Sequence, residues 1–440
     1  MFGREWVVVG LLACVATSCR RVSTERAATA TPSSDASGDG GPSPSSVPSL
    51  EPRTEADFSA PIAATRMGTT RVVAGLVAAK GLLRVVGWPH EGPAWTTDAL
   101  TGVAWTADAE LRLDPAGDGI AVVWHGSFGG RPTHTVVLLG SRGEPRGAPV
   151  EVGGSSCATA AGLVWLDAAP HGPAHARART WGDATVHDVA IVPSDRAASV
   201  LCGDNDAFLL GDGDDDLTST TFSPEERQAA PPTVVIRDSD FGDDDERDHR
   251  AFTTGDTLGL VRVSGSGAIA LRDVSRSGAS PWRRLKHKIG PDDDVVAADG
   301  DGATTLVVFT HDVDEACEGG STAERARVLR ADRAAGQDAL FDLARADCRV
   351  ARGPFWVAGA SGGAFVAWVE RSGGAGPGSA PIEAIAFGAA GGASPAGRMD
   401  LAADAVVQGG CDGDCWAAAL VRAPDADASQ PEAIVLRAFP

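Results

Sequence analysis

A short turn rich in glycine and aspartate, followed by a run of apolar or β-branched residues, recurs along most of this 440-residue chain. Gly117, Asp118 and Gly119, for example, precede the run at 120–124. Glycine and aspartate adopt the positive-φ conformations that hairpin turns need, and short apolar runs between such turns are typical of β-strands. The runs are 120–124, 163–166, 207–210, 258–263, 306–309, 364–369 and 416–421, with a looser copy at 81–86.

Many of these runs are followed by a polar loop and a second apolar run, as in a β-hairpin. Helical periodicity is scarce, and the main candidate for a helix is the segment 323–333. The pattern therefore predicts an all-β body. The second runs are 135–139, 186–192, 382–387 and 433–437.

The spacing of the runs predicts how the strands assemble. The runs start about 40 to 60 residues apart, and a spacing near 47 is typical of propeller blades. Because a single blade cannot bury both of its faces, blades stack around an axis. We expect a β-propeller with seven or eight blades, the alternative being a pair of β-sandwiches or another all-β arrangement. The body resembles a propeller repeat domain of no identifiable family, since it has neither a WD nor a kelch signature.

The first nineteen residues have the layout of a secretory signal. Arg4 precedes an apolar run at 6–16 that is too short to span a bilayer, and small residues then lead to Cys19. This segment resembles the signal of bacterial lipoprotein precursors. The resemblance implies a signal peptide at 1–18, lipidation of Cys19, and attachment to the outer membrane, because Arg20 is unlike the aspartate that retains such proteins at the inner membrane.

Palmitate labelling tests which cysteine carries the lipid. We expect the label to be lost in Cys19→Ala and retained in Cys14→Ala. The segment 11–14 also fits the cleavage pattern, but cleavage there would leave too short an apolar run. Loss of the label in Cys14→Ala alone would reverse the assignment.

The rest of the chain divides into a linker and a body. The segment 19–62 is rich in Ser, Pro, Gly, Ala, Thr and Asp, and we expect a disordered, flexible tether because it cannot bury enough apolar surface to offset its ordering entropy. The segment 63–440 is expected to form the propeller-like domain, in which tryptophans within the predicted strands belong to the core. These tryptophans are Trp124, Trp165, Trp368 and Trp416.

Six cysteines lie in the body, an even number that suggests disulfides in an exported chain. Sequence cannot fix their connectivity, but pairing of nearest neighbours is the favoured arrangement. The last pair brackets a short turn, which would allow its members to meet across a hairpin. The expected pairs are Cys157–Cys202, Cys317–Cys348 and Cys411–Cys415.

The net charge of −21 has the wrong sign for binding nucleic acid, whose phosphates require Lys and Arg. We expect the acidic clusters of the sequence to be solvated loops, because blocks of like charge usually mark exposed segments. Asp212, Asp214 and Asp216 are candidate calcium ligands, but Leu217 and Ser223 stand where an EF-hand loop needs glycine and glutamate. We therefore expect no cofactor, with calcium as the alternative.

No motif identifies a reaction. The segment 359–363 matches the G-x-S-x-G pattern around Ser361, but a strand is predicted after it where such hydrolases have a helix. His171 and His175 are four apart, and Gly172 with Pro173 between them predicts a surface loop. The absence of tyrosine from the sequence excludes the tyrosine nucleophile of propeller-shaped sialidases.

These observations predict an exported, lipid-anchored protein of the cell envelope with a non-catalytic binding or scaffolding role on the propeller rim, where the loops gather. We expect a monomer that contacts the membrane through its lipid and binds a protein or glycan ligand, and no nucleic acid. One alternative is an extracytoplasmic hydrolase or lyase that acts on polysaccharide or peptidoglycan through loop carboxylates. A second alternative is a calcium-stabilised surface adhesin.

Overall fold

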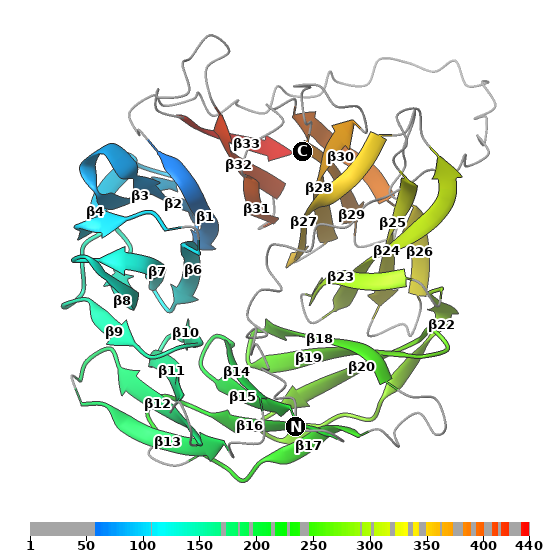
Figure 1. Cartoon of the computed structure of the whole chain (residues 1–440), viewed down its shortest axis with the longest axis horizontal. Helices are drawn as coiled ribbons and strands as arrows, with labels where there is room; N and C mark the ends of the chain where they lie inside the picture. Colours follow the sequence, from blue (N-terminus) through cyan, green and yellow to red (C-terminus); the bar gives the residue numbers. More distant parts are fainter. Residues whose placement is uncertain are drawn as a thin grey trace, which may run out of the picture.

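Eight antiparallel β-sheets follow one another around a ring in the computed structural model (Figure 1). In most sheets the strands are hydrogen-bonded in the order in which they occur in the chain, starting from the inner strand. The described residues are 58–106, 108–168, 173–183, 185–192, 197–212, 216–226, 229–237, 246–290, 293–300, 303–316, 322–332, 338–342, 349–360, 363–372, 382–388, 393–399, 407–411, 415–421 and 433–439.

The first four sheets occupy the N-terminal half of the described chain. Sheet 1 contains β1 (Ser59–Met67), β2 (Thr70–Val77), β3 (Leu82–Pro89) and β4 (Trp95–Thr101), with a 3-10 turn η1 (Ala78–Lys80). Sheet 2 contains β5 (Val103–Ala104), β6 (Glu110–Ala116), β7 (Gly119–Phe128), β8 (Arg131–Leu139) and β9 (Val150–Val152). Sheet 3 contains β10 (Ser156–Ala158), β11 (Gly162–Ala168), β12 (Ala174–Thr180) and β13 (His187–Val192). Sheet 4 contains β14 (Ala197–Cys202), β15 (Ala207–Asp212), β16 (Asp216–Phe222) and β17 (Thr233–Arg237).

The remaining four sheets complete the ring. Sheet 5 contains β18 (Glu246–Thr254), β19 (Thr257–Ser264), β20 (Ala268–Ser275), β21 (Gly278–Ala279) and β22 (Arg283–Lys288). Sheet 6 contains β23 (Asp293–Gly300), β24 (Thr304–Ala316), β25 (Thr322–Asp332) and β26 (Asp338–Asp342). Sheet 7 contains β27 (Arg349–Ala360), β28 (Gly363–Ser372), β29 (Ile382–Gly388) and β30 (Ala393–Met399). Sheet 8 contains β31 (Val407–Cys411), β32 (Cys415–Val421) and β33 (Ala433–Phe439).

The predicted all-β propeller is confirmed, and the described residues form eight sheets. Every predicted apolar run from 163–166 onward lies in the second strand of its sheet, which has a neighbour on both sides. The run 120–124 lies in β7, which pairs with β5, β6 and β8. The looser copy at 81–86 lies in β3, one strand later than the others. β1 begins at Ser59, shortly before the expected boundary at residue 63. The described residues include no helix long and apolar enough to cross a bilayer.

Two segments differ from the sequence-based expectation. The candidate helix at 323–333 is the strand β25, which pairs with β24 on one side and β26 on the other. The expected loop around His175 is the strand β12, in which Ala176 and Ala178 are fully buried. Alanine and arginine favour helices in isolation, but pairing with two neighbouring strands overrides that weak preference in both segments.

Apolar side chains pack between neighbouring sheets and form the core. Trp124 is fully buried between sheets 1 and 2, and Trp165 is buried between sheets 2 and 3, so both have the expected core role. Ala418 of sheet 8 packs with Phe58 and Val73 of sheet 1, which closes the ring. The side chains of Trp368 and Trp416 lie outside those that the structure describes.

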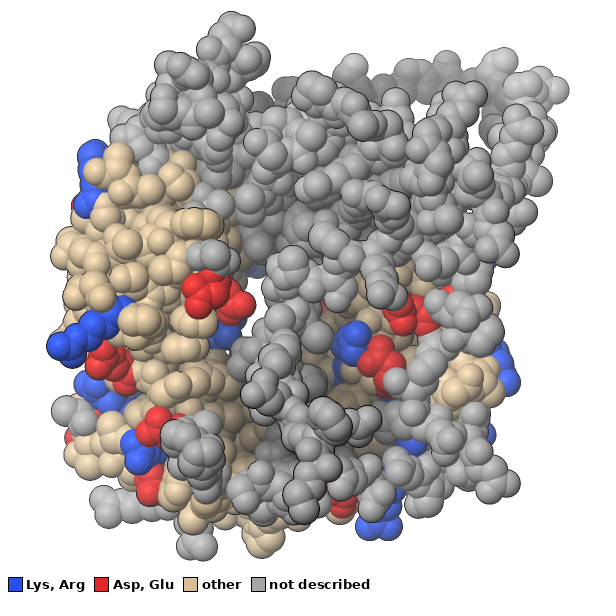
Figure 2. Space-filling view, in the orientation of Figure 1, with Lys and Arg blue, Asp and Glu red and all other residues tan. Residues whose placement is uncertain are grey.

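The hydrogen bonds between strands stay within each sheet. Arginine side chains on inner strands add hydrogen bonds from one sheet to the next. Arg112 of β6 pairs with Asp114 and donates to the carbonyl oxygen of Ser156 in sheet 3. Arg250 of β18 repeats the arrangement, donating to the Val295 oxygen of sheet 6 at 2.7 Å. On the face shown in Figure 2, acidic and basic side chains of the described residues are interspersed.

Candidate functional site

The turns between the first and second strands of successive sheets bond to one another, and we call them the turn rim. In sheets 3 to 6 the turn rim includes 159–161, 203–206, 255–256 and Gly300. The Ala160 amide donates to the Asp204 carbonyl oxygen at 2.7 Å, and the Asp204 amide donates to that of Gly255 at 3.1 Å. The Thr254 hydroxyl donates to the Gly300 oxygen at 2.8 Å. The repeated Gly/Asp turns therefore connect the blades as well as reversing the chain.

A cluster of charged residues joins the turns of sheets 4 and 5. The Arg276 guanidinium donates to Asp206 at 2.5 and 3.2 Å and pairs with Glu226. Hydrogen bonds from Arg276 hold the pKa of Glu226 below its ordinary value. Burial opposes ionisation of Asp256, but hydrogen bonds from Asn205 outweigh it and lower the pKa of that carboxyl. These carboxylates are ionised and already bonded, so the cluster is suited to linking blades.

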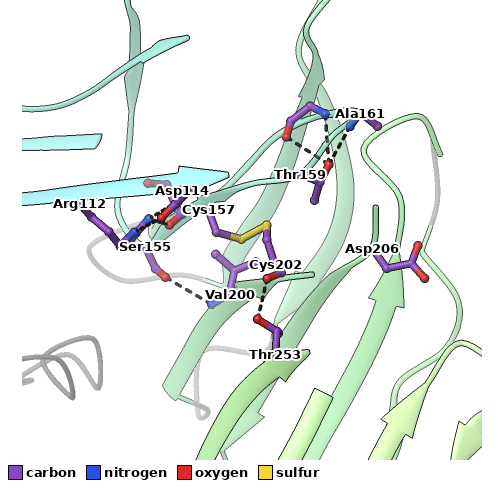
Figure 3. The surroundings of a disulfide bond; sticks show 12 residues. Arg112, Asp114, Ser155, Cys157, Thr159, Ala161, Val200, Cys202, Asp206 and Thr253 are labelled. Carbon is purple, nitrogen blue, oxygen red and sulfur yellow. Dashed lines mark hydrogen bonds and ion pairs between the residues drawn. A yellow bond between two sulfur atoms is a disulfide. The ribbon is translucent and has the colours of Figure 1, made fainter. Parts of the chain in front are cut away.

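A disulfide joins the inner strands of sheets 3 and 4 close to the turn rim (Figure 3). Cys157 of β10 and Cys202 of β14 have Cα atoms 5.6 Å apart, within the usual range for a disulfide. Cys202 also accepts a hydrogen bond at its carbonyl oxygen from the Thr253 hydroxyl of sheet 5, at 2.7 Å. The bond is the first of the three nearest-neighbour pairs expected from the sequence.

A cavity lies between sheets 2 and 3, beside the turn rim, and we call it the inter-blade pocket. Its volume is about 450 Å³, and its lining combines apolar side chains with three charged ones. Apolar surface with a few placed polar groups is typical of ligand sites. The indole nitrogen of Trp181 donates to the Thr159 carbonyl oxygen at 3.0 Å, which fixes the ring. The lining residues are Ala116, Asp118, Val136, Leu138, Arg146, Gly147, Ala148, Val150, Ala160, Arg179 and Trp181.

The two arginines of the inter-blade pocket differ in their partners. Arg146 makes a two-point ion pair with Asp118, at 2.6 and 2.8 Å, and its hydrogen bonds lower the pKa of Asp118. Arg179 donates from Nε to the Asp183 carbonyl oxygen at 2.9 Å and has no carboxylate partner among the described residues. Arg179 therefore brings a guanidinium that forms no ion pair with a described carboxylate.

A pair of stacked histidines occupies the opposite end of sheet 2. The rings of His125 and His134 are parallel to within 18° with centroids 3.8 Å apart. Burial and the neighbouring His125 lower the pKa of His134, while Asp108 acts in the other direction. Two such rings cannot both carry a proton without repulsion. In the described part of the chain, no group of three or more His, Cys, Asp or Glu side chains could hold a metal ion.

The other residues singled out from the sequence lie apart from the inter-blade pocket. Asp212 ends β15 and Asp216 begins β16, so they flank one hairpin turn. Cys411 and Cys415 are directly paired in register across β31 and β32, as their expected disulfide requires. Cys19, Asp214, Cys317, Cys348 and His171 lie outside the described residues.

The G-x-S-x-G segment lies between two paired strands. Ala360 of β27 pairs with Gly363 of β28, and Ser361 itself lies outside the described residues. The nucleophilic serine of hydrolases with this motif lies between a strand and a helix. The strand expected after the motif is present as β28, and the absence of a catalytic role for Ser361 stays a prediction.

Sequence reasoning missed Arg179 and Trp181. Arg179 lies in β12 and Trp181 comes directly after it. The sequence did not predict this strand, because its apolar residues are alanines. One signal was available: Trp181 precedes Gly182 and Asp183, so it is a large aromatic residue placed at a turn. Such a residue has less opportunity to enter the core than one within a strand.

Comparison with known proteins identifies a shared fold and no family. No family model and no curated protein matches the chain. A solved prolyl endopeptidase superposes with a TM-score of 0.52 and 10% identity, over 84% of this chain and 55% of the other. The β-propeller domain of the Trilobed protease from Pyrococcus furiosus matches at 0.44 and 9%, over 76% and 94% of the two chains. This chain thus spans about half the length of the prolyl endopeptidase that it matches.

The likeness to a prolyl endopeptidase corrects the expected function. At 10% identity it shows a shared fold. The non-catalytic binding or scaffolding role was expected by analogy with the propeller fold, and the solved protein that shares the fold here is a prolyl endopeptidase. The analogy therefore no longer supports that role, because one fold serves many functions and the site must decide between them.

Proposed function

We propose that this chain is the propeller part of a peptidase and takes part in peptide hydrolysis by receiving the peptide. The fold likeness to a prolyl endopeptidase supports the reaction class. The observation that carries the proposal is the inter-blade pocket, which combines an apolar wall, a fixed tryptophan and an arginine without a carboxylate partner among the described residues. Peptides offer the matching groups, namely apolar side chains, carbonyl oxygens and carboxylates.

The site of action follows from the leader sequence. If Cys19 carries a lipid, the propeller acts on peptides outside the cytoplasm while held at the outer membrane. The segment 19–62 would then give the domain reach from the bilayer, since a chain rich in Gly, Ser and Pro is flexible or semi-rigid and extended.

Calorimetric titration of the full chain with peptides tests the proposed function. We expect saturable binding of apolar tetra- to decapeptides, with and without proline, and no binding of peptidoglycan-derived oligosaccharides. Trp181→Ala should weaken peptide binding about three- to tenfold, because an aromatic contact contributes about 0.5–1.5 kcal/mol beyond area burial.

Trp105→Ala is the matched control, since Trp105 is 59% exposed and lies outside the pocket. This variant should bind peptides as the unmodified chain does. Failure of every peptide to bind, or binding of the oligosaccharides alone, would overturn the proposed function.

A further inference from the structure

The geometry points to a binding site for the C-terminal residue of a peptide in the inter-blade pocket. Arg179 would bind the free α-carboxylate, and the apolar wall with Trp181 would contact the side chain of the same residue. This inference rests on the proposed function for the source of the ligand, and it goes beyond it by naming which end of the peptide is bound.

The position of Arg179 is set by its strand. Arg179 pairs with Leu163 across β11 and β12, and Leu163 packs against sheet 2, so residues in this register face the neighbouring blade. The bond from its Nε to the Asp183 oxygen holds the guanidinium in place. Its two terminal nitrogens have no acceptor among the described residues, and two parallel N–H groups suit the two oxygens of a carboxylate.

The neighbouring charge restricts the anion. Arg146 lies in the same pocket, but both of its terminal nitrogens donate to the Asp118 carboxylate. Its Nη2 atom also lies 3.6 Å from Oε1 of Glu144. The lining of the pocket therefore supplies one guanidinium without an ion pair, Arg179, beside the ion pair of Asp118 with Arg146. That arrangement suits a singly charged carboxylate better than a phosphate, which carries more charge and would be repelled by Asp118.

The apolar side chains that line the pocket favour binding of the C-terminal residue of a peptide over binding of an acidic side chain. Val136, Leu138 and Val150 line the cavity beside Trp181, whose only polar atom is already bonded to Thr159. A C-terminal residue brings its carboxylate and its own apolar side chain together, so it can occupy both parts of a cavity of about 450 Å³. An aspartate or glutamate within a peptide would leave the apolar part without a side chain to contact.

Paired peptides that differ only at the C-terminus test the inference. The probes are one apolar pentapeptide as the free acid, the same peptide as the C-terminal amide, and the amide with an internal glutamate. We expect the acid to bind the full chain about tenfold more tightly than either amide, since hydrogen bonds to a charged group contribute more than neutral ones. The advantage of the acid should shrink as salt is raised, because the pocket is partly open to solvent.

Substitution of Arg179 should remove this discrimination. In Arg179→Met the acid should bind as weakly as the amide, while the amide should be affected little. Arg131→Met is the matched control, because Arg131 is an exposed arginine at the start of β8, outside the pocket. Thermal melting of both variants checks the fold, and Ala148→Leu, which narrows the pocket, should weaken the acid and the amide together.

The outcomes separate this inference from the proposed function. Equal binding of acid and amide to the unmodified chain would overturn the carboxylate site and leave peptide binding intact. Tighter binding of the glutamate-containing amide than of the acid would assign the pocket to an acidic side chain instead. Failure of all three peptides to bind would overturn the proposed function itself.

Discussion

Removal of the Cys157–Cys202 disulfide is expected to lower the free energy of unfolding by about 4 kcal/mol. The two cysteines are 45 positions apart in the sequence, and a cross-link of that span restricts the unfolded chain more than one that closes a short loop. The bond also joins two sheets that share no strand hydrogen bonds. Urea denaturation of the Cys157→Ser/Cys202→Ser variant, compared with the unmodified chain, measures the effect.

Reduction provides the control for this experiment. A thiol reductant should lower the denaturation midpoint of the unmodified chain and change that of the double variant less. Peptide mapping of the unmodified chain should find Cys157 and Cys202 in one linked pair. Two free thiols at these positions, or equal midpoints for variant and unmodified chain, would contradict the assigned role.

Gly203→Ala is expected to destabilise the ring by about 3 kcal/mol, at the upper end of the usual cost of overpacking. A Cβ atom at Gly203 would lie 2.0 Å from the carbonyl oxygen of Gly255 in the next sheet. The obstacle is backbone, so no side chain can rotate away. Relief would require sheets 4 and 5 to separate at the turn rim and would stretch the hydrogen bond from Asp204 to Gly255.

Gly182→Ala is the matched control for this prediction. A Cβ atom there would have no heavy atom within 4 Å, and Gly182 is not among the glycines with positive φ. We expect its denaturation midpoint to change little, or to rise slightly because alanine restricts the unfolded chain. Similar midpoints for Gly203→Ala and Gly182→Ala would show that the turn rim does not hold the blades together.

The fold was largely predictable because its signal is local. The run 258–263 is apolar except for Arg262 and follows Gly255 and Asp256, and it lies in β19, a buried second strand. The strands that escaped prediction, β12 and β25, are rich in Ala and Arg, and their pairing partners decide their conformation. The Gly/Asp turns thus predicted the second strands of most sheets correctly. The composition of the strands β12 and β25 did not predict them, because Ala and Arg do not favour strands.

The candidate site was much less predictable. The partners of its arginines are distant in sequence: Asp118 and Arg146 are 28 residues apart, and Asp206 and Arg276 in the charge cluster are 70 apart. The sequence indicated neither pair, because a surplus of acidic residues gives every arginine many candidate partners. That Arg146 has a carboxylate partner and Arg179 has none among the described residues is apparent only from the structure.

From sequence alone came the all-β class, the spacing of the blades and the Cys157–Cys202 pair, because turns, apolar runs and nearest-neighbour cysteines act over short stretches of chain. Only the tertiary structure established that the described sheets are eight, that the Gly/Asp turns bond from blade to blade, and that a pocket with Arg179 and Trp181 lies between sheets 2 and 3. The reason is that these features arise where separate sheets meet, and the residues that meet there are set by the curvature of the whole ring.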